Sequence, residues 1–139
     1  MPDTKEQFTE ATDLEELGRY DEALALLFAL IKTDANNADF WNRIGIIRFR
    51  QGNYRDAVNA FGQATGIDPG YASARFNRSL ALVHLGKETE ALRDLDKVLG
   101  LNPLDSEAQS QRSLIVGRLA RSGEKKKPDL GPVQSQLSV

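Results

Sequence analysis

A 34-residue periodicity constrains the fold of this 139-residue chain more than any other feature of its sequence. A glycine, an alanine five residues later and a large apolar residue four beyond it recur three times: Gly18, Gly52 and Gly86; Ala23, Ala57 and Ala91; Leu27, Phe61 and Leu95. Around each glycine, apolar residues recur at three- and four-residue spacing, which is typical of α-helices. Each period therefore predicts two helices that meet at the glycine, and successive pairs must stack to bury their apolar faces.

The middle period, Ala38–Tyr71, is the most regular of the three. Its two helix-length halves meet at Gln51-Gly52-Asn53, where Asn53 is a good N-cap for the second helix. Its key residues stand at fixed offsets: Trp41, Ile44, Gly45, Gly52, Tyr54, Ala57, Phe61, Ala64 and Pro69. The segment resembles one tetratricopeptide repeat (TPR), a 34-residue helix–turn–helix unit with the pattern W-x2-L-G…Y…A-x3-F…P. The resemblance covers Thr4–Asp105 and implies an all-α, right-handed α-solenoid of helix–turn–helix repeats.

The resemblance divides the chain into a TPR domain at residues 1–123 and a tail. We expect repeats at residues 4–37, 38–71 and 72–105, followed by a capping helix at residues 106–122 that Gly123 ends. Residues 124–139 contain few large apolar side chains, so we predict a disordered C-terminal tail.

The third repeat departs from the family pattern in its first helix. Arg75 and Arg78 stand where an aromatic residue and a leucine are usual. We predict that their stems cover apolar surface while the guanidinium groups stay in water, and pairing with a ligand is the alternative. Three glycines lie in or near the second helices: Gly62, Gly66 and Gly100. Each destabilises its helix by about 1 kcal/mol relative to alanine, and we predict that close packing of a neighbouring helix is the reason for a glycine there.

Composition argues against several classes of protein. The chain has no cysteine, which excludes disulfides and thiolate chemistry, and its net charge of −2 argues against a general nucleic-acid surface. The sequence contains no run of about 18 apolar residues, which a membrane-spanning helix would need, so we expect no membrane insertion. The polar, acidic start does not resemble a signal peptide. We therefore predict a cytoplasmic protein, although a chain trimmed of its signal would look the same.

Catalytic chemistry finds no support in the sequence. His84 is the only histidine and lacks a second histidine with which to hold a metal, so we predict an exposed or half-buried helical residue. The repeated glycines fall at repeat turns and form neither a phosphate-binding loop nor a dinucleotide motif. We predict no enzymatic activity, no cofactor and no metal.

The resemblance also implies a concave groove, lined by the first helix of each repeat, that binds a peptide or helix of a partner. An apolar strip flanked by arginines is predicted there, and exposed strips of this kind mark interaction sites. Coverage of the strip by the tail or the capping helix is the alternative. The predicted partner-binding residues are Phe8, Asn42, Arg43, Ile46, Phe49, Arg50, Phe76, Asn77, Leu80, Val83, His84, Leu114 and Arg118.

One subtype of the family is not predicted. TPR co-chaperones of the major heat-shock proteins clamp a C-terminal carboxylate with lysine, asparagine and arginine side chains of three successive first helices. At the five matching positions this chain carries other residues, none of which matches the clamp. These residues are Phe8, Thr12, Arg43, Ser73 and Asn77. We therefore do not expect a carboxylate clamp of that kind.

Taken with the groove, these features predict a non-catalytic scaffold or adaptor that binds a protein or peptide partner. A dedicated chaperone for a secreted or assembling protein is the alternative, because small bacterial secretion chaperones are similar in size and repeat number. Residues 1–37 carry a net charge of −6 and residues 106–139 a net charge of +3. This asymmetry favours head-to-tail self-association, and solvated charged faces are the alternative.

Overall fold

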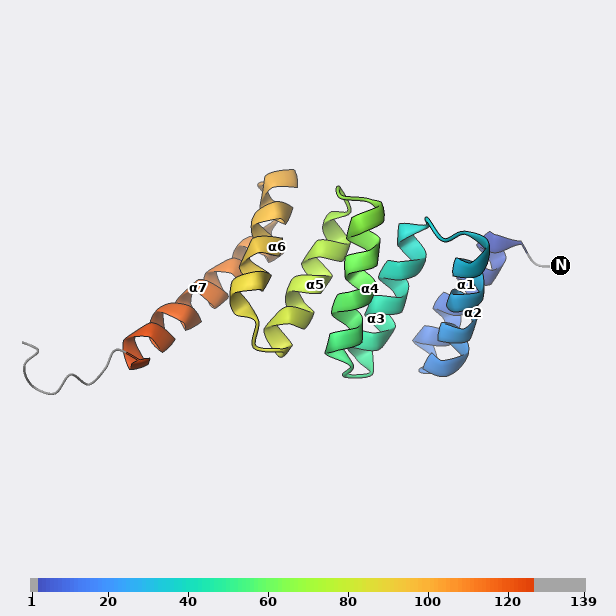
Figure 1. The fold of residues 1–139 in the computed structure, drawn as a ribbon, viewed down its shortest axis with the longest axis horizontal. Coiled ribbons are helices and arrows are strands. Elements are labelled where there is room, and N and C mark those ends of the chain that lie inside the picture. The colour runs from blue at the N-terminus through green and yellow to red at the C-terminus, as the bar shows by residue number, and fades with distance from the viewer. Residues whose placement is uncertain (1–2, 127–139) are drawn as a thin grey trace, which may run out of the picture.

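The computed structural model describes residues 3–126, which form seven α-helices stacked along one long axis (Figure 1). Three antiparallel pairs are followed by a final helix, with α1 and α2 at one end of the stack and α7 at the other. The all-α class and the stacked helix pairs are confirmed. None of the described helices has the length and hydropathy that crossing a membrane requires. The helices are α1 (Thr4–Glu16), α2 (Tyr20–Thr33), α3 (Ala38–Arg50), α4 (Tyr54–Ile67), α5 (Ala72–His84), α6 (Glu88–Leu101) and α7 (Ser106–Lys126).

Each pair turns at a glycine in the left-handed conformation, which a side chain would strain. The φ angles of Gly18, Gly52 and Gly86 are 76°, 78° and 76°. At the middle turn, the N–H of Gly52 donates to the carbonyl of Phe49 at 2.9 Å, and the next N–H donates to the carbonyl of Arg48 at 2.8 Å. This Schellman arrangement satisfies the last carbonyls of α3. Asn53 then caps α4 by accepting from the N–H of Asp56 at 3.3 Å, as predicted.

The core runs between neighbouring helices along the stack instead of collecting at one centre. The alanines and large apolar residues of the 34-residue period are all buried, as the periodicity requires. Gly45 of α3 lies against Phe61 of α4 so closely that a Cβ built on the glycine would overlap the ring. The predicted close packing at Gly66 and Gly100 is wrong, because no atom lies within 4 Å of a Cβ built there. Gly62 has only a guanidinium nitrogen near it, at 3.6 Å.

The arginines of the third repeat are placed differently from the prediction. Arg78 donates two hydrogen bonds, of 2.6 and 2.8 Å, to the carboxylate of Asp94 on α6. Arg75 lies 3.8 Å from the same carboxylate. The hydrogen bond to Asp94 raises the pKa of Arg78 above its ordinary value, so this guanidinium stays charged. The expectation that these groups stay in water is wrong because a buried acid on the neighbouring helix pairs with them.

The last helix is longer than predicted. It continues to Lys126 and so passes Gly123, where the sequence predicted its end. One glycine in an exposed stretch of helix costs only about 1 kcal/mol, which does not stop a helix that is otherwise favoured. The predicted tail therefore begins inside α7 for residues 124–126, and the remainder, residues 127–139, lies outside the described residues.

Candidate partner-binding groove

A small apolar cavity lies between α3 and α5, where the sequence predicted the groove. Its volume is about 180 Å³. In α3, Phe49 and Arg50 follow Ile46 by three and four positions, and in α5 Leu80 follows Asn77 by three, so these side chains lie on one side of each helix. Phe61 reaches the cavity from α4. Five of the six lining residues are predicted groove residues; the six are Ile46, Phe49, Arg50, Phe61, Asn77 and Leu80.

An aromatic cluster holds one wall of this cavity. The ring of Phe49 makes T-shaped contacts with the rings of Tyr54 and His84, with centroid distances of 5.2 and 5.3 Å. Tyr54 and His84 stack on each other at 4.2 Å with an interplanar angle of 6°. His84 is exposed, as predicted, and its ring contacts Phe49. Tyr54 was noted in the sequence only as part of the repeat pattern.

A buried carboxylate forms ion pairs with the two arginines of the groove. The side chain of Glu15, on α1, is only 1% exposed and lies 3.1 Å from Arg43 and 3.0 Å from Arg50. A buried charge of this kind is tolerated only when it is paired, and here two guanidinium groups pair with it. The cluster as a whole keeps one positive charge. Arg50 is half exposed at the rim of the cavity, so it carries that charge to the groove surface.

A chain of hydrogen bonds orients the polar wall of the cavity. Asn77 donates to the side-chain oxygen of buried Asn42 at 3.2 Å, and Asn42 donates to the hydroxyl of Tyr71 at 3.2 Å. The Tyr71 hydroxyl in turn donates to Asp39 at 2.7 Å. Burial, aided by the hydrogen bond and charge of Asp39, raises the pKa of Tyr71 to about 12. Tyr71 therefore stays a neutral donor at physiological pH and holds the amides in place.

The other predicted groove residues do not line this cavity. Phe8 packs on Phe40 with a centroid distance of 5.3 Å, and Val83 packs against the core between α6 and α7. Phe76 lines a separate, polar hollow with Asp105 and Glu107. The remaining two lie on α7, where Leu114 is exposed and Arg118 pairs with Glu88 at 2.8 Å.

Another hollow, of about 270 Å³, lies between α2, α3 and α4. The exposed ring of Phe28 and the ring of Trp41 line it, together with Arg48 and Asp56. It is a competing surface for a partner on the side of the second helices. Within residues 3–126, the structure contains no group of three or more acidic or histidine side chains placed to hold a metal ion.

Comparison with known proteins gives consistent matches. The sequence profile of the tetratricopeptide repeat matches residues 8–53 and 42–106. The chain is 28% identical over 102 residues to a TPR repeat-containing protein of Rhizobium etli, across 73% of this chain and 50% of that protein. The chain thus spans about half the length of this relative, and smaller shares of the other curated relatives it matches.

Solved structures share the fold. The first TPR domain of Spaghetti (RPAP3), bound to the HSP90 peptide SRMEEVD, matches with a TM-score of 0.80 and 25% identity, over 84% of this chain and 93% of that chain. The Yersinia enterocolitica type III secretion chaperone SycD, in complex with a peptide of the translocator YopD, matches with a TM-score of 0.73 and 20% identity, over 88% and 94% of the two chains. The likeness to SycD concerns the fold alone.

Proposed function

The chain belongs to the tetratricopeptide repeat family, and we propose that it is a non-catalytic interaction module whose groove binds a peptide or helical segment of a partner protein. The observation that carries the proposal is the cavity between α3 and α5. Ile46, Phe49 and Leu80 give it apolar walls, while Arg50 and Asn77 place hydrogen-bond donors at its edge. A cavity with few polar groups in fixed positions is the usual form of a specific binding site.

The cavity suits an apolar side chain of the partner as the anchor of the complex. The related domain of Spaghetti (RPAP3) is bound to the HSP90 peptide SRMEEVD, in which the last residue is an aspartate that follows a valine, and this supports peptide binding by this fold. This chain lacks the family's carboxylate clamp, however, so the anchor differs. We expect the apolar side chain to fill the cavity, Asn77 to bond to the peptide, and Arg50 to favour a nearby acidic residue.

A dedicated chaperone would use the same cavity but differ in how it holds its partner. It would co-purify with its client in fixed stoichiometry, whereas an adaptor exchanges partners. Isolation of the protein from its native source, followed by measurement of the mass and stoichiometry of the complex, separates the two functions. We favour the adaptor because the cavity is small enough to hold a single side chain and little more.

The proposal is tested with a peptide selected against the immobilised protein from a random library displayed on phage. Fluorescence anisotropy then measures its affinity for Phe49→Ala and Leu80→Ala variants. Anchoring aromatic and aliphatic contacts often contribute about 2 kcal/mol or more, so we expect each variant to bind at least about 30-fold more weakly. Arg50→Glu should slow association with an acidic peptide, most strongly at low salt.

Phe28→Ala is the matched control, because it removes an exposed aromatic ring from the hollow between α2 and α4. Circular dichroism confirms that each variant folds. Wild-type affinity in both cavity variants, with the helical signal intact, would exclude this cavity as the binding site. Loss of affinity in Phe28→Ala alone would place the partner on the opposite side.

A further inference from the structure

The last helix carries an exposed face that the proposed groove does not explain. Among residues 106–123 of α7, for which burial is described, only Ala108 and Ile115 are fully buried, and they face α6. The opposite face of α7 is open to solvent. This helix takes the place of the first helix of a fourth repeat, and no described helix pairs with it as a second helix would. Leu114 and Val116 are 56% and 42% exposed there.

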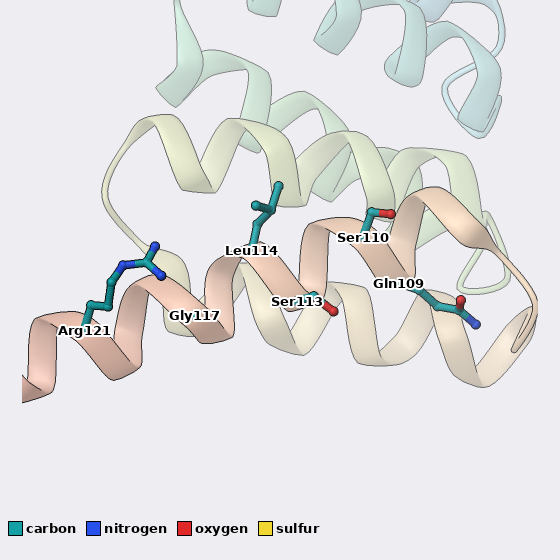
Figure 2. Close-up of a pocket in the computed structure, with 6 residues that line it drawn as sticks. All are labelled: Gln109, Ser110, Ser113, Leu114, Gly117 and Arg121. Atoms are coloured by element: carbon teal, nitrogen blue, oxygen red, sulfur yellow. The ribbon is translucent and has the colours of Figure 1, made fainter.

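A shallow hollow of about 640 Å³ runs along this face. Figure 2 shows six of its residues spread over the length of α7, from Gln109 near the start to Arg121 near the end. Ser110, Ser113 and Gly117 are small, so the centre of the face is low and another helix could approach its backbone closely.

The face is nearly symmetric about Ile115. Ser113 and Gly117 lie at equal distances on either side of it in the sequence, and so do Leu114 and Val116. In an antiparallel helix pair with a two-fold axis at the level of Ile115, a residue that follows Ile115 in one copy lies level with the residue that precedes Ile115 by the same number of positions in the other copy. A face whose residues are similar on both sides of Ile115 is therefore complementary to itself. With 3.6 residues per turn, Leu114 would meet its own copy at one edge and Val116 its own copy at the other.

Charge is self-complementary in the same arrangement. Glu107 and Arg121 lie on the same edge as Leu114, one near each end of α7. They are 14 positions apart, about 21 Å along a helix, so they cannot pair within one chain. In the antiparallel pair, Arg121 of one copy lies beside Glu107 of the other, and symmetry makes this contact twice.

We infer that the occupant of this face is a second copy of the chain, in an antiparallel, two-fold symmetric dimer of α7 helices. A 21-residue helix is about 31 Å long, and one helix pair buries less area than the roughly 1,200–2,000 Å² of stable complexes. The dimer is therefore weak and depends on concentration. It joins two binding grooves in one particle, which raises the avidity for a partner that carries two binding segments.

The head-to-tail alternative gives a poorer fit. In α3, α5 and α7, the residues that pack on the preceding helix are apolar and buried, such as Phe40 and Ile47 of α3. The matching residues of α1 are Glu6 and Asp13, both exposed. An approaching α7 would thus meet carboxylates where its Leu114 and Val116 need apolar contacts.

Sedimentation velocity of the full chain over a wide concentration range tests the inference. We expect a monomer–dimer equilibrium that Gly117→Leu weakens at least about tenfold. Glu107→Arg and Arg121→Glu should each weaken the dimer, and the double variant with the charges exchanged should restore it. Glu10→Arg, the same charge change on exposed α1, should leave it unchanged, and circular dichroism checks that every variant folds.

A monomer at all concentrations would overturn the inference, including the case in which residues 127–139 cover the face. Formation of assemblies larger than a dimer, if Glu10→Arg abolishes them, would establish head-to-tail assembly instead of the two-fold dimer. A dimer that is insensitive to Gly117→Leu and to the exchange of charges would place the interface elsewhere. These results are independent of peptide binding, because none of the substituted residues lines the cavity between α3 and α5.

Discussion

Removal of the Asp94 carboxylate should destabilise the protein far more than the loss of an ordinary surface charge. Asp94 is 4% exposed and accepts two hydrogen bonds from Arg78, with Arg75 close by. The substitution Asp94→Ala leaves two guanidinium groups between α5 and α6 without this counter-charge. Their donors would then be partly withheld from both water and carboxylate, which raises the free energy of the folded state.

The magnitude follows from burial. Breaking a fully buried ion pair by removing one partner costs about 3–5 kcal/mol. The side chain of Arg78 is 23% exposed, so water can solvate part of its guanidinium after the substitution. We therefore expect a loss of about 2–3 kcal/mol in the free energy of unfolding, at or just below the lower limit for fully buried pairs.

The same helix supplies a control. Asp96 pairs with Arg112 at 2.8 Å, but both side chains are about half exposed. Pairs of this kind contribute about 1 kcal/mol or less, so Asp96→Ala should change stability little. Both variants replace aspartate by alanine within α6, so the gain in helix propensity is common to them and cancels in the comparison.

A double substitution tests the physical cause. The second repeat has Ile44 and Ala60 where the third has Arg78 and Asp94. Replacing a buried ion pair by well-packed apolar residues is often neutral, so Arg78→Ile combined with Asp94→Ala should recover most of the stability that Asp94→Ala loses. Urea unfolding followed by helical circular dichroism measures the three variants and the wild type. Equal stability of Asp94→Ala and Asp96→Ala would refute the argument.

Three further predictions concern other parts of the structure. Ala57→Leu should destabilise by about 1–3 kcal/mol through overpacking between α3 and α4, and an unchanged thermal melt would contradict that packing. Glu15→Gln should lower the melting temperature but speed association with acidic peptides at low salt, since Arg43 and Arg50 lose their counter-charge; unchanged association rates would argue against it. Folding raises the pKa of Tyr71 from 10.0 to about 12, so its contribution to stability is present below pH 10 and is lost as the pH rises towards 12. When the free energy of unfolding is measured across that pH range, it should fall less in Tyr71→Phe than in the wild type. Identical pH profiles of the two proteins would contradict the assignment.

The fold could be predicted because the 34-residue period repeats local rules. A glycine at Gly52 with helix-forming segments on both sides specifies one turn, and the same turn recurs in its neighbours. The end of α7 was missed because an exposed glycine such as Gly123 only weakens a helix. Helix ends depend on small differences in free energy, whereas the buried face of a repeat depends on large ones.

The ionic contacts could not be predicted from the period, because they join residues on different helices. Glu15 stands at a position that faces the groove in the family, and nothing near it in the sequence shows that two arginines would enclose it. A signal for the other pair was present. Arg78 and Asp94 both depart from the apolar residues of the second repeat at facing positions, and a paired departure of this kind indicates a buried ion pair.

The central claim is that the cavity between α3 and α5 binds the partner, and an NMR titration tests it most directly. The protein is labelled with ¹⁵N and titrated with the peptide selected from the phage library. We predict that the largest changes in amide chemical shift fall on α3 and α5, around Ile46, Phe49 and Leu80. Changes concentrated around Phe28 on α2, with those three amides unmoved, would contradict the claim.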